Sequence, residues 1–283
     1  MGLGAAYTAV GGDIDAMFFN PAGVARITDA ALTTSYEKGF AEQSVGSLGY
    51  AHPFPFGSVF VGGGYFDAGT IQLNQSDGTQ GEVRAQQDAV GMAGVAIGRD
   101  VPFSIGLTGK FLRSELAEAA SATVGAVDVG VQWKTPWTGL DFGIAVQNLG
   151  PDIKYEQEGD PLPHTVRAGI AYALDLVSLG WFKDFPYQFL VVADGVQVKE
   201  DETGFHGGLE VTRIFDMGGI DGAASLRGGY RSEAEAVDVG LGFVVANVVV
   251  DYAVGIISDI DLTHRFTIGY RFAPRKKTSL KFD

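Results

Sequence analysis

The residues of this chain that could carry out chemistry are scattered, and their spacing predicts no reaction centre. Four histidines are present, without the spacing of metal ligands, at His52, His164, His206 and His264. Gly12, Asp13 and Asp15 match only a fragment of a calcium-binding loop. The chain has no Gly-x-Ser-x-Gly elbow, no phosphate or dinucleotide loop and no cysteine. We therefore predict that the protein is not an enzyme and holds no metal or cofactor.

The charged residues follow a clearer order, because many of them alternate with apolar side chains. In residues 127–134, three valines and Trp133 alternate with Asp128, Gly130, Gln132 and Lys134. Successive side chains of an extended chain point to opposite faces, so such a segment has one apolar and one polar face. Nine charged residues lie on the polar faces of segments of this kind: Lys110, Asp128, Arg167, Glu210, Arg227, Asp238, Asp251, Arg265 and Arg271.

This two-residue period predicts strands along nearly the whole chain after about residue 30. The last of them, residues 265–272, reads Arg-Phe-Thr-Ile-Gly-Tyr-Arg-Phe. Turn residues such as those of Pro53–Gly57 and Gly150–Asp152 separate the segments. We predict about fourteen strands, near residues 30–37, 44–53, 58–73, 83–98, 102–115, 121–134, 139–148, 164–174, 186–198, 204–214, 222–232, 236–245, 247–257 and 262–272.

An antiparallel transmembrane β-barrel explains why the polar faces are small and rich in glycine. Glycine accounts for 41 of the 283 residues, and hydrophobic residues make up 46%. No apolar run approaches the ~20 residues of a spanning helix, so membrane insertion requires a closed sheet. A charge facing lipid would cost about 2–4 kcal/mol at the midplane, which directs the charged faces to the lumen. We predict that the nine charged residues form a lumenal ladder that keeps the strands in register, with a role in selectivity as the alternative.

The net charge of −14 argues against nucleic-acid partners, because no basic stripe is present to neutralise phosphates. Basic residues cluster only at Arg275–Lys277, where we expect a solvated tail or a headgroup anchor. No signal peptide follows Met1, so we expect a processed form or a start downstream of the natural one. A soluble β-sandwich or propeller is the alternative to the membrane barrel.

Residues 1–28 lack the two-residue period and predict a compact, partly helical segment. Ala5–Val10 fits a short helix that the following glycines end, and Asp13 can cap a second turn over Ile14–Phe19. Asn20–Pro21 should stop that turn. We therefore predict three regions, which are an N-terminal hatch or plug at 1–28, a barrel at 29–273 and a tail at 274–283.

Five stretches of the sequence together form a recognisable set of motifs. The first runs from Ala6 to Gly23 and contains Ala-Tyr-Thr-Ala-Val, an acidic pair and Asn-Pro-Ala-Gly. The others are Gln147–Pro151, Asp160–Arg167, Leu226–Tyr230 and His264–Phe272. In this order they resemble the PorV/PorQ-type outer-membrane proteins, which are relatives of the FadL long-chain fatty-acid transporters. The resemblance implies a fourteen-stranded barrel whose N-terminal segment folds inside as a hatch. It also implies that four residues end the hatch and lead into the first strand: Asn20, Pro21, Ala22 and Gly23. We expect them to form a turn that stops the helix, with a direct part in ligand gating as the alternative.

The resemblance places the protein in a bacterial outer membrane and leaves different classes of function open. The first is passive transport or binding of small hydrophobic molecules, without a cofactor or an energy source. The second is a protein-binding component of a surface secretion system of type IX or of another surface assembly. A purely structural barrel is the third. The expected partners are accordingly outer-membrane lipid, small hydrophobic ligands, and surface or secretion proteins.

Overall fold

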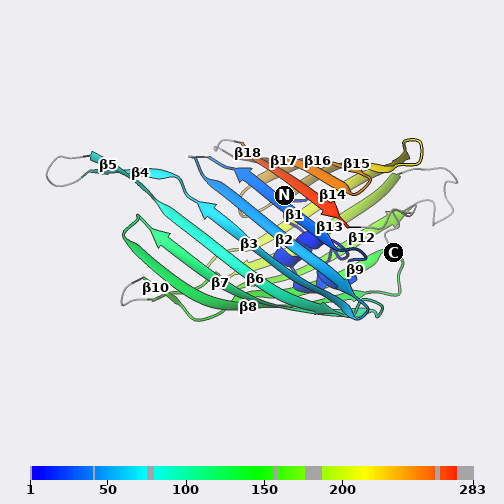
Figure 1. The fold of residues 1–283 in the computed structure, drawn as a ribbon, viewed down its shortest axis with the longest axis horizontal. Coiled ribbons are helices and arrows are strands. Elements are labelled where there is room, and N and C mark those ends of the chain that lie inside the picture. Colours follow the sequence, from blue (N-terminus) through cyan, green and yellow to red (C-terminus); the bar gives the residue numbers. More distant parts are fainter. Residues whose placement is uncertain are drawn as a thin grey trace.

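The computed structural model describes residues 2–40, 42–74, 80–155, 159–175, 187–258 and 262–272. Within them, fourteen antiparallel strands form a closed barrel (Figure 1). The first strand, β1, pairs with the last, β18, along its whole length, which closes the ring. In chain order the barrel strands are β1 (Ala31–Lys38), β2 (Ser44–Phe54), β3 (Gly57–Asp67), β6 (Gln86–Ile97), β7 (Phe103–Leu116), β8 (Ala120–Lys134), β9 (Leu140–Leu149), β12 (Thr165–Asp175), β13 (Tyr187–Val198), β14 (Thr203–Asp216), β15 (Asp221–Arg231), β16 (Ala236–Val245), β17 (Val248–Ile257) and β18 (Thr263–Arg271). The predicted fold class is confirmed.

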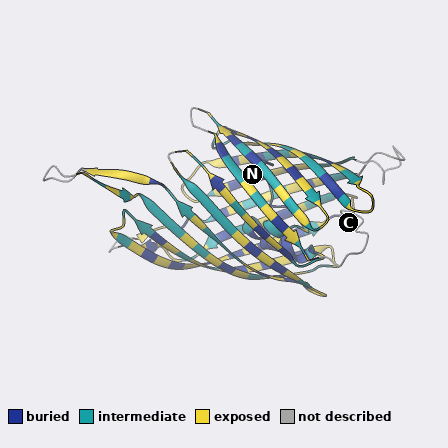
Figure 2. Ribbon diagram, turned by 45° about the horizontal axis from the view of Figure 1, so that its top comes forward, coloured by how far each residue is buried: buried dark blue, intermediate teal, exposed yellow. Residues whose placement is uncertain are grey.

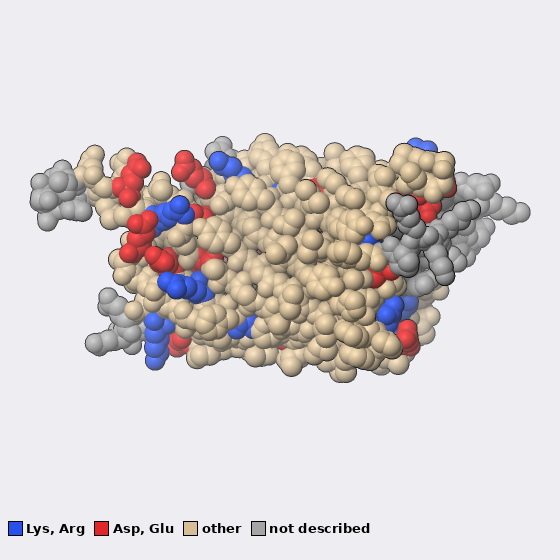
Figure 3. All heavy atoms as spheres, viewed as in Figure 1, with Lys and Arg blue, Asp and Glu red and all other residues tan. Residues whose placement is uncertain are grey.

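Side chains alternate between the outer and the lumenal surface. Along β7, Phe103, Ile105 and Leu107 are about half exposed, whereas Ser104 and Thr108 are completely buried. Figure 2 shows the same alternation of buried and exposed residues on other strands. In Figure 3 the charged residues gather mainly toward the two ends of the barrel, and a broad uncharged belt lies between them. An apolar belt of this size would be unstable in water, so it faces lipid.

None of the helices in the described part of the chain is long and apolar enough to span a membrane.

Replacing Leu107 with arginine is expected to destabilise the barrel by about 2–4 kcal/mol, because the charge would enter the hydrocarbon layer. Leu107 lies at the centre of the apolar run between Phe103 and Phe111, and its side chain points outward. Reversible urea unfolding in lipid vesicles measures the change. Val101→Arg, in the turn before β7, is the control, since that arginine remains in contact with water. Equal losses for the two variants would contradict a lipid-facing Leu107.

Two predicted strands are too long. The segments 58–73 and 83–98 each divide into a barrel strand and a short outer strand. The outer strands, β4 (Thr70–Asn74) and β5 (Gln80–Arg84), pair with each other as a hairpin that extends past the barrel rim (Figure 1). In the first segment the break falls at Gly69, whose φ of 82° ends the regular strand, and in the second it falls at Ala85. A two-residue period carries no sign of either break.

The long connection after β9 contains one further hairpin, formed by β10 (Ile153–Lys154) and β11 (Gly159–Asp160). Ile153 and Leu162 pack there against Ala122, Val124 and Ala126 on the lumenal side of β8. The predicted tail, residues 274–283 with its basic cluster, lies outside the described residues.

The N-terminal segment folds inside the barrel (Figure 1), and we call residues 2–27 the hatch. Its first 3-10 helix, η1 (Ile14–Phe18), begins after Asp13, whose Oδ1 accepts a hydrogen bond from the backbone N–H of Asp15 at 2.8 Å. This cap confirms the role predicted for Asp13. A second 3-10 helix, η2 (Pro21–Arg26), follows directly and is buried along most of its length.

Two predictions for the hatch are wrong. The residues expected to form a helix at 5–10 form turns instead. The Asn20–Gly23 stretch does not lead into the first strand, because Asn20 caps η2 by accepting from the backbone N–H of Ala22 at 3.1 Å. Pro21 suits the first position of that helix, where its missing N–H would have no partner. The chain stays inside the barrel until Ile27 and only then continues to β1.

Candidate functional site

The hatch rests directly on the backbone of the barrel wall at inward-facing glycines. A Cβ atom at Gly229 would lie 2.0 Å from the backbone nitrogen of Gly4, and one at Gly143 would lie 2.1 Å from the carbonyl oxygen of Thr8. Real Cβ atoms do not approach other atoms so closely, so a side chain at either position would exclude the hatch. Gly106, Gly130 and Gly208 of the wall lie against backbone atoms of the hatch or against Asn20 in the same way. We call these five residues the glycine seat.

Asp194 on β13 binds the first part of the hatch. Its Oδ2 accepts hydrogen bonds from the backbone N–H of Tyr7 at 2.9 Å, from the backbone N–H of Thr8 at 3.0 Å and from the Thr8 hydroxyl at 2.6 Å. Hydrogen bonds to an ionised carboxylate are among the stronger ones in proteins. Asp194 and Thr8 are both buried, so water does not compete for these bonds.

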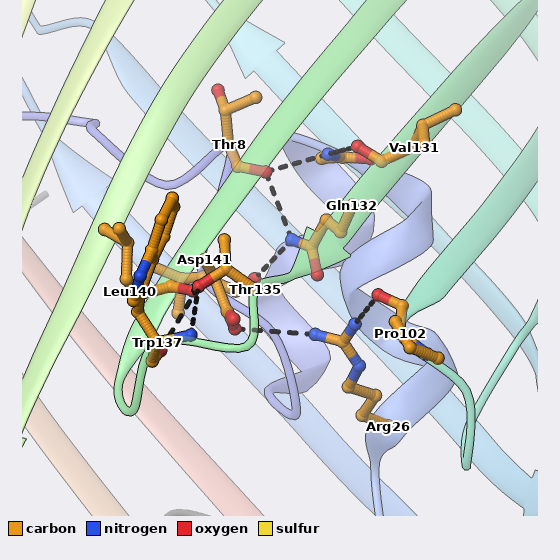
Figure 4. Close-up of polar contacts among 11 residues, drawn as sticks. Thr8, Arg26, Pro102, Val131, Gln132, Thr135, Trp137, Leu140 and Asp141 are labelled. Carbon is orange, nitrogen blue, oxygen red and sulfur yellow. Dashed lines mark hydrogen bonds and ion pairs between the residues drawn. The ribbon is translucent and has the colours of Figure 1, made fainter.

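Gln132 on β8 binds the middle of the hatch (Figure 4). Its Nε2 donates to the carbonyl oxygens of Thr8 at 3.1 Å and Val10 at 3.0 Å. Within the hatch, Asn20 Nδ2 donates to the same Thr8 carbonyl at 2.8 Å and to that of Val131 in the wall at 3.2 Å. Two amide side chains, one from the hatch and one from the wall, therefore converge on Thr8.

Gln147 and Arg167 belong to two of the stretches that resemble the PorV/PorQ-type proteins, and both contact the stretch at residues 6–23. Gln147 Nε2 donates to the carbonyl oxygen of Phe18 at 3.1 Å, and Arg167 Nε donates to Gln147 Oε1 at 3.0 Å. The Arg167 guanidinium carbon lies 5.6 Å from the centre of the Phe19 ring, within the range of a cation–π contact. Motifs that are far apart in the sequence thus meet at the end of η1.

The last part of the hatch is held near the end of the barrel at which β1 begins. Ser58 Oγ donates to the carbonyl oxygen of Val24 at 2.5 Å. Arg26 lies 3.5 Å from Asp141 and donates through Nη2 to the carbonyl oxygen of Pro102 at 3.2 Å (Figure 4). The hatch is therefore bound at its start, middle and end by side chains from different strands.

Most residues of the predicted charge ladder form ion pairs on the lumenal face. Arg227 contacts both Glu210 on the adjacent strand and Asp251 two strands away. The second contact passes over Gly242 of the strand between them, where a Cβ atom would lie 2.5 Å from the Asp251 carboxylate. The other pairs are Lys110–Asp128 at 2.6 Å, Arg231–Asp238 at 2.9 Å and Arg265–Glu37 at 2.7 Å. Their roles in register and selectivity stay predictions.

Arg271, the last member of the ladder, lines a crevice of about 80 Å³ between the hatch and strands β1, β17 and β18. Asp13, Asp15 and Asp251 also line it. Burial, together with the nearby charge of Asp13, raises the pKa of Asp15 to about 7. The crevice is therefore more negative above that pH than below it.

The predicted hatch residues Asn20, Pro21, Ala22 and Gly23 lie together against the wall. Pro21 and Ala22 contact Gly106 of β7, and Gly23 lies beside Gln132 of β8. Their part in ligand gating stays a prediction.

Asp194 and Gln132 are not among the predicted site residues, although both occupy polar positions of predicted strands. Alternation marks such residues as lumenal, but it does not indicate which of them touch the hatch. Asp194 and Thr8, for example, are 186 positions apart in the chain.

Neither a protein-family model nor a curated protein sequence matches this chain. Solved structures match its fold. The toluene transporter TodX of Pseudomonas putida aligns with a TM-score of 0.61 at 9% identity, over 95% of this chain and 96% of that one. A Pseudomonas aeruginosa FadL homologue aligns with a TM-score of 0.56 at 10% identity, over 96% of each chain. The chain therefore has the fold of FadL-type outer-membrane β-barrels.

Proposed function

We propose that this protein is a passive channel for small hydrophobic molecules in a bacterial outer membrane, and that the hatch is its gate. The observation that carries the proposal is the way the lumen is blocked. The obstruction is a separate segment of about 26 residues that rests on glycines and is bound by a few side chains. A segment held in this way can leave its seat while the barrel strands remain paired.

The similarity in fold supports the same proposal. TodX is a toluene transporter, and a variant of it that is described as a monoaromatic hydrocarbon channel aligns over 95% of this chain with a TM-score of 0.52. We infer the class of molecule that passes through this channel only from its similarity in fold to TodX. A passive channel requires no catalytic residue and no cofactor, in agreement with the motifs of the sequence.

Uptake of labelled toluene by cells that make the protein tests the proposal. The cells need an outer leaflet of lipopolysaccharide, because that leaflet slows the entry of apolar molecules, whereas a simple phospholipid vesicle does not. We expect faster toluene uptake with the protein than without it, and unchanged uptake of a sugar, which a seated hatch excludes. Equal toluene uptake in the two strains would contradict the channel.

A protein-binding role in a secretion or other surface assembly, as the PorV/PorQ resemblance implies, is the second candidate. The hairpin of β4 and β5 favours it. Ile71 and Leu73 are exposed on one face of this hairpin, and Val83 pairs with Ile71. Two-stranded hairpins are marginally stable alone, so a partner would stabilise this one. Cross-linking in native membranes should capture a stoichiometric partner that the double variant Ile71→Lys, Leu73→Lys loses.

A further inference from the structure

Asp194 and Arg167 of the lumenal wall both contact the hatch, Asp194 through hydrogen bonds and Arg167 through the Phe19 ring. Asp194 uses Oδ2 for the hatch, while its buried Oδ1 has no hydrogen-bond partner among the described residues. Arg167 donates through Nε to Gln147, while its buried Nη1 has no partner in the same part of the chain. The two residues lie on the adjacent strands β13 and β12, and Asp194 is directly opposite Gly169, two positions from Arg167. Asp194 Oδ1 lies over Gly169, 2.0 Å from the position a Cβ would take there, so the unpaired acceptor lies beside a residue two positions from Arg167.

The hatch presents a hydroxyl group and an aromatic ring to these same two residues. The Thr8 hydroxyl donates to Asp194 at 2.6 Å, and the Phe19 ring lies against the Arg167 guanidinium. The Tyr7 and Phe19 rings are 5.4 Å apart, so an aromatic surface continues from one residue to the other. When the hatch leaves, the buried carboxylate loses its donors and the guanidinium loses its ring, and both losses oppose opening.

We propose, on the premise that the protein is a hatch-gated channel, that Asp194 and Arg167 form a subsite for a hydroxylated aromatic molecule. A phenolic hydroxyl donates to the Asp194 carboxylate and accepts from Arg167 Nη1, and its ring replaces Phe19 against the guanidinium. The molecule thereby restores the contacts that the departing hatch gives up. A ligand favours the open state only to the extent that it binds that state better, and these contacts supply the difference.

The proposed subsite should bind three molecules that differ in one substituent with different affinities. Toluene offers the ring but no donor, so Asp194 would remain unpaired. The carboxylate of p-toluate can accept from Arg167, but it has no proton to donate to Asp194 and brings a second negative charge beside it. The hydroxyl of p-cresol meets both the acceptor and the donor. We therefore expect the order p-cresol, then toluene, then p-toluate in their ability to release the hatch.

Thiol labelling of the full chain tests this order, since the protein has no cysteine of its own. Ala9→Cys places one thiol in the buried part of the hatch, where Ala9 is 2% exposed. A water-soluble maleimide should label it slowly with the hatch seated. At equal concentrations, p-cresol is expected to raise the labelling rate about tenfold above the rate with toluene, as restored hydrogen bonds to charged groups would do. The p-toluate anion should not raise the rate.

Ala119→Cys, in the exposed turn between β7 and β8, controls for effects of the aromatic compounds on the reagent. In the Ala9→Cys background, Arg167→Met removes the donor and leaves the Asp194 acceptor, so it is expected to reduce the advantage of p-cresol over toluene. Equal labelling with p-cresol and toluene in the parent, or a p-cresol preference that Arg167→Met leaves undiminished, would overturn the subsite. Either outcome leaves the channel proposal standing, because toluene uptake tests that proposal separately.

Discussion

Replacing Gly229 with leucine is expected to drive the hatch from its seat and open the lumen to polar solutes. The first side-chain atom at this position would lie 2.0 Å from the backbone nitrogen of Gly4 and 2.4 Å from the carbonyl carbon of Leu3. Both are backbone atoms, which cannot turn aside as the end of a flexible side chain can. Overpacking of this kind costs about 1–3 kcal/mol or more, which corresponds to a roughly 5- to 150-fold rise in the displaced population. Swelling of vesicles in a sugar solution measures the opening.

Gly228→Leu is a matched control one residue away. Gly228 points outward, and no atom of the described residues lies within 4 Å of the position its Cβ would take, so leucine there enters lipid without touching the hatch. A heat-dependent shift on unboiled gels confirms that each variant still forms a barrel. If Gly229→Leu admits sugar no faster than Gly228→Leu does, the glycine seat does not hold the hatch.

Replacing Asp194 with alanine is expected to free the start of the hatch while the barrel remains folded. The change removes the acceptor of three hydrogen bonds and leaves the backbone N–H groups of Tyr7 and Thr8 buried without partners. Each unsatisfied group costs about 1–3 kcal/mol. Hydrogen exchange at the Tyr7 and Thr8 amides should accelerate at least about tenfold, since one such loss alone changes an opening equilibrium by that order.

Asp194→Asn keeps a hydrogen-bond acceptor at position 194 and removes the negative charge, so it shows which of the two holds the hatch. Its amide keeps one oxygen that can accept from Tyr7 and Thr8, so exchange at these amides should be slower than in Asp194→Ala and faster than in the parent. Amides of β7, on another side of the ring, should exchange at the same rate in all three proteins. Unchanged exchange at Tyr7 and Thr8 in Asp194→Ala would show that other contacts hold this part of the hatch.

The strands could be predicted closely because alternation of apolar and polar side chains is a local property. The segment predicted at 236–245 coincides with β16 (Ala236–Val245), and the one predicted at 44–53 falls one residue short of β2 (Ser44–Phe54). A capped turn is equally local, since Asp13 and the N–H that it accepts from are two residues apart. Lipid requires apolar side chains on one face of a strand, and the lumen accepts polar side chains on the other. The sequence of each strand therefore shows by itself which face meets lipid.

The contacts of the hatch could not be predicted, because they join residues that no local pattern relates. Gln132 and Asp194 are 124 and 186 positions from Thr8, and each is one of many polar residues on lumenal faces. Which of them meets the hatch depends on how far each strand is displaced along its neighbour when β18 closes on β1. That displacement is set by all the strands of the closed barrel together. The glycine seat and the hydrogen bonds to the hatch therefore form only when all the strands have paired.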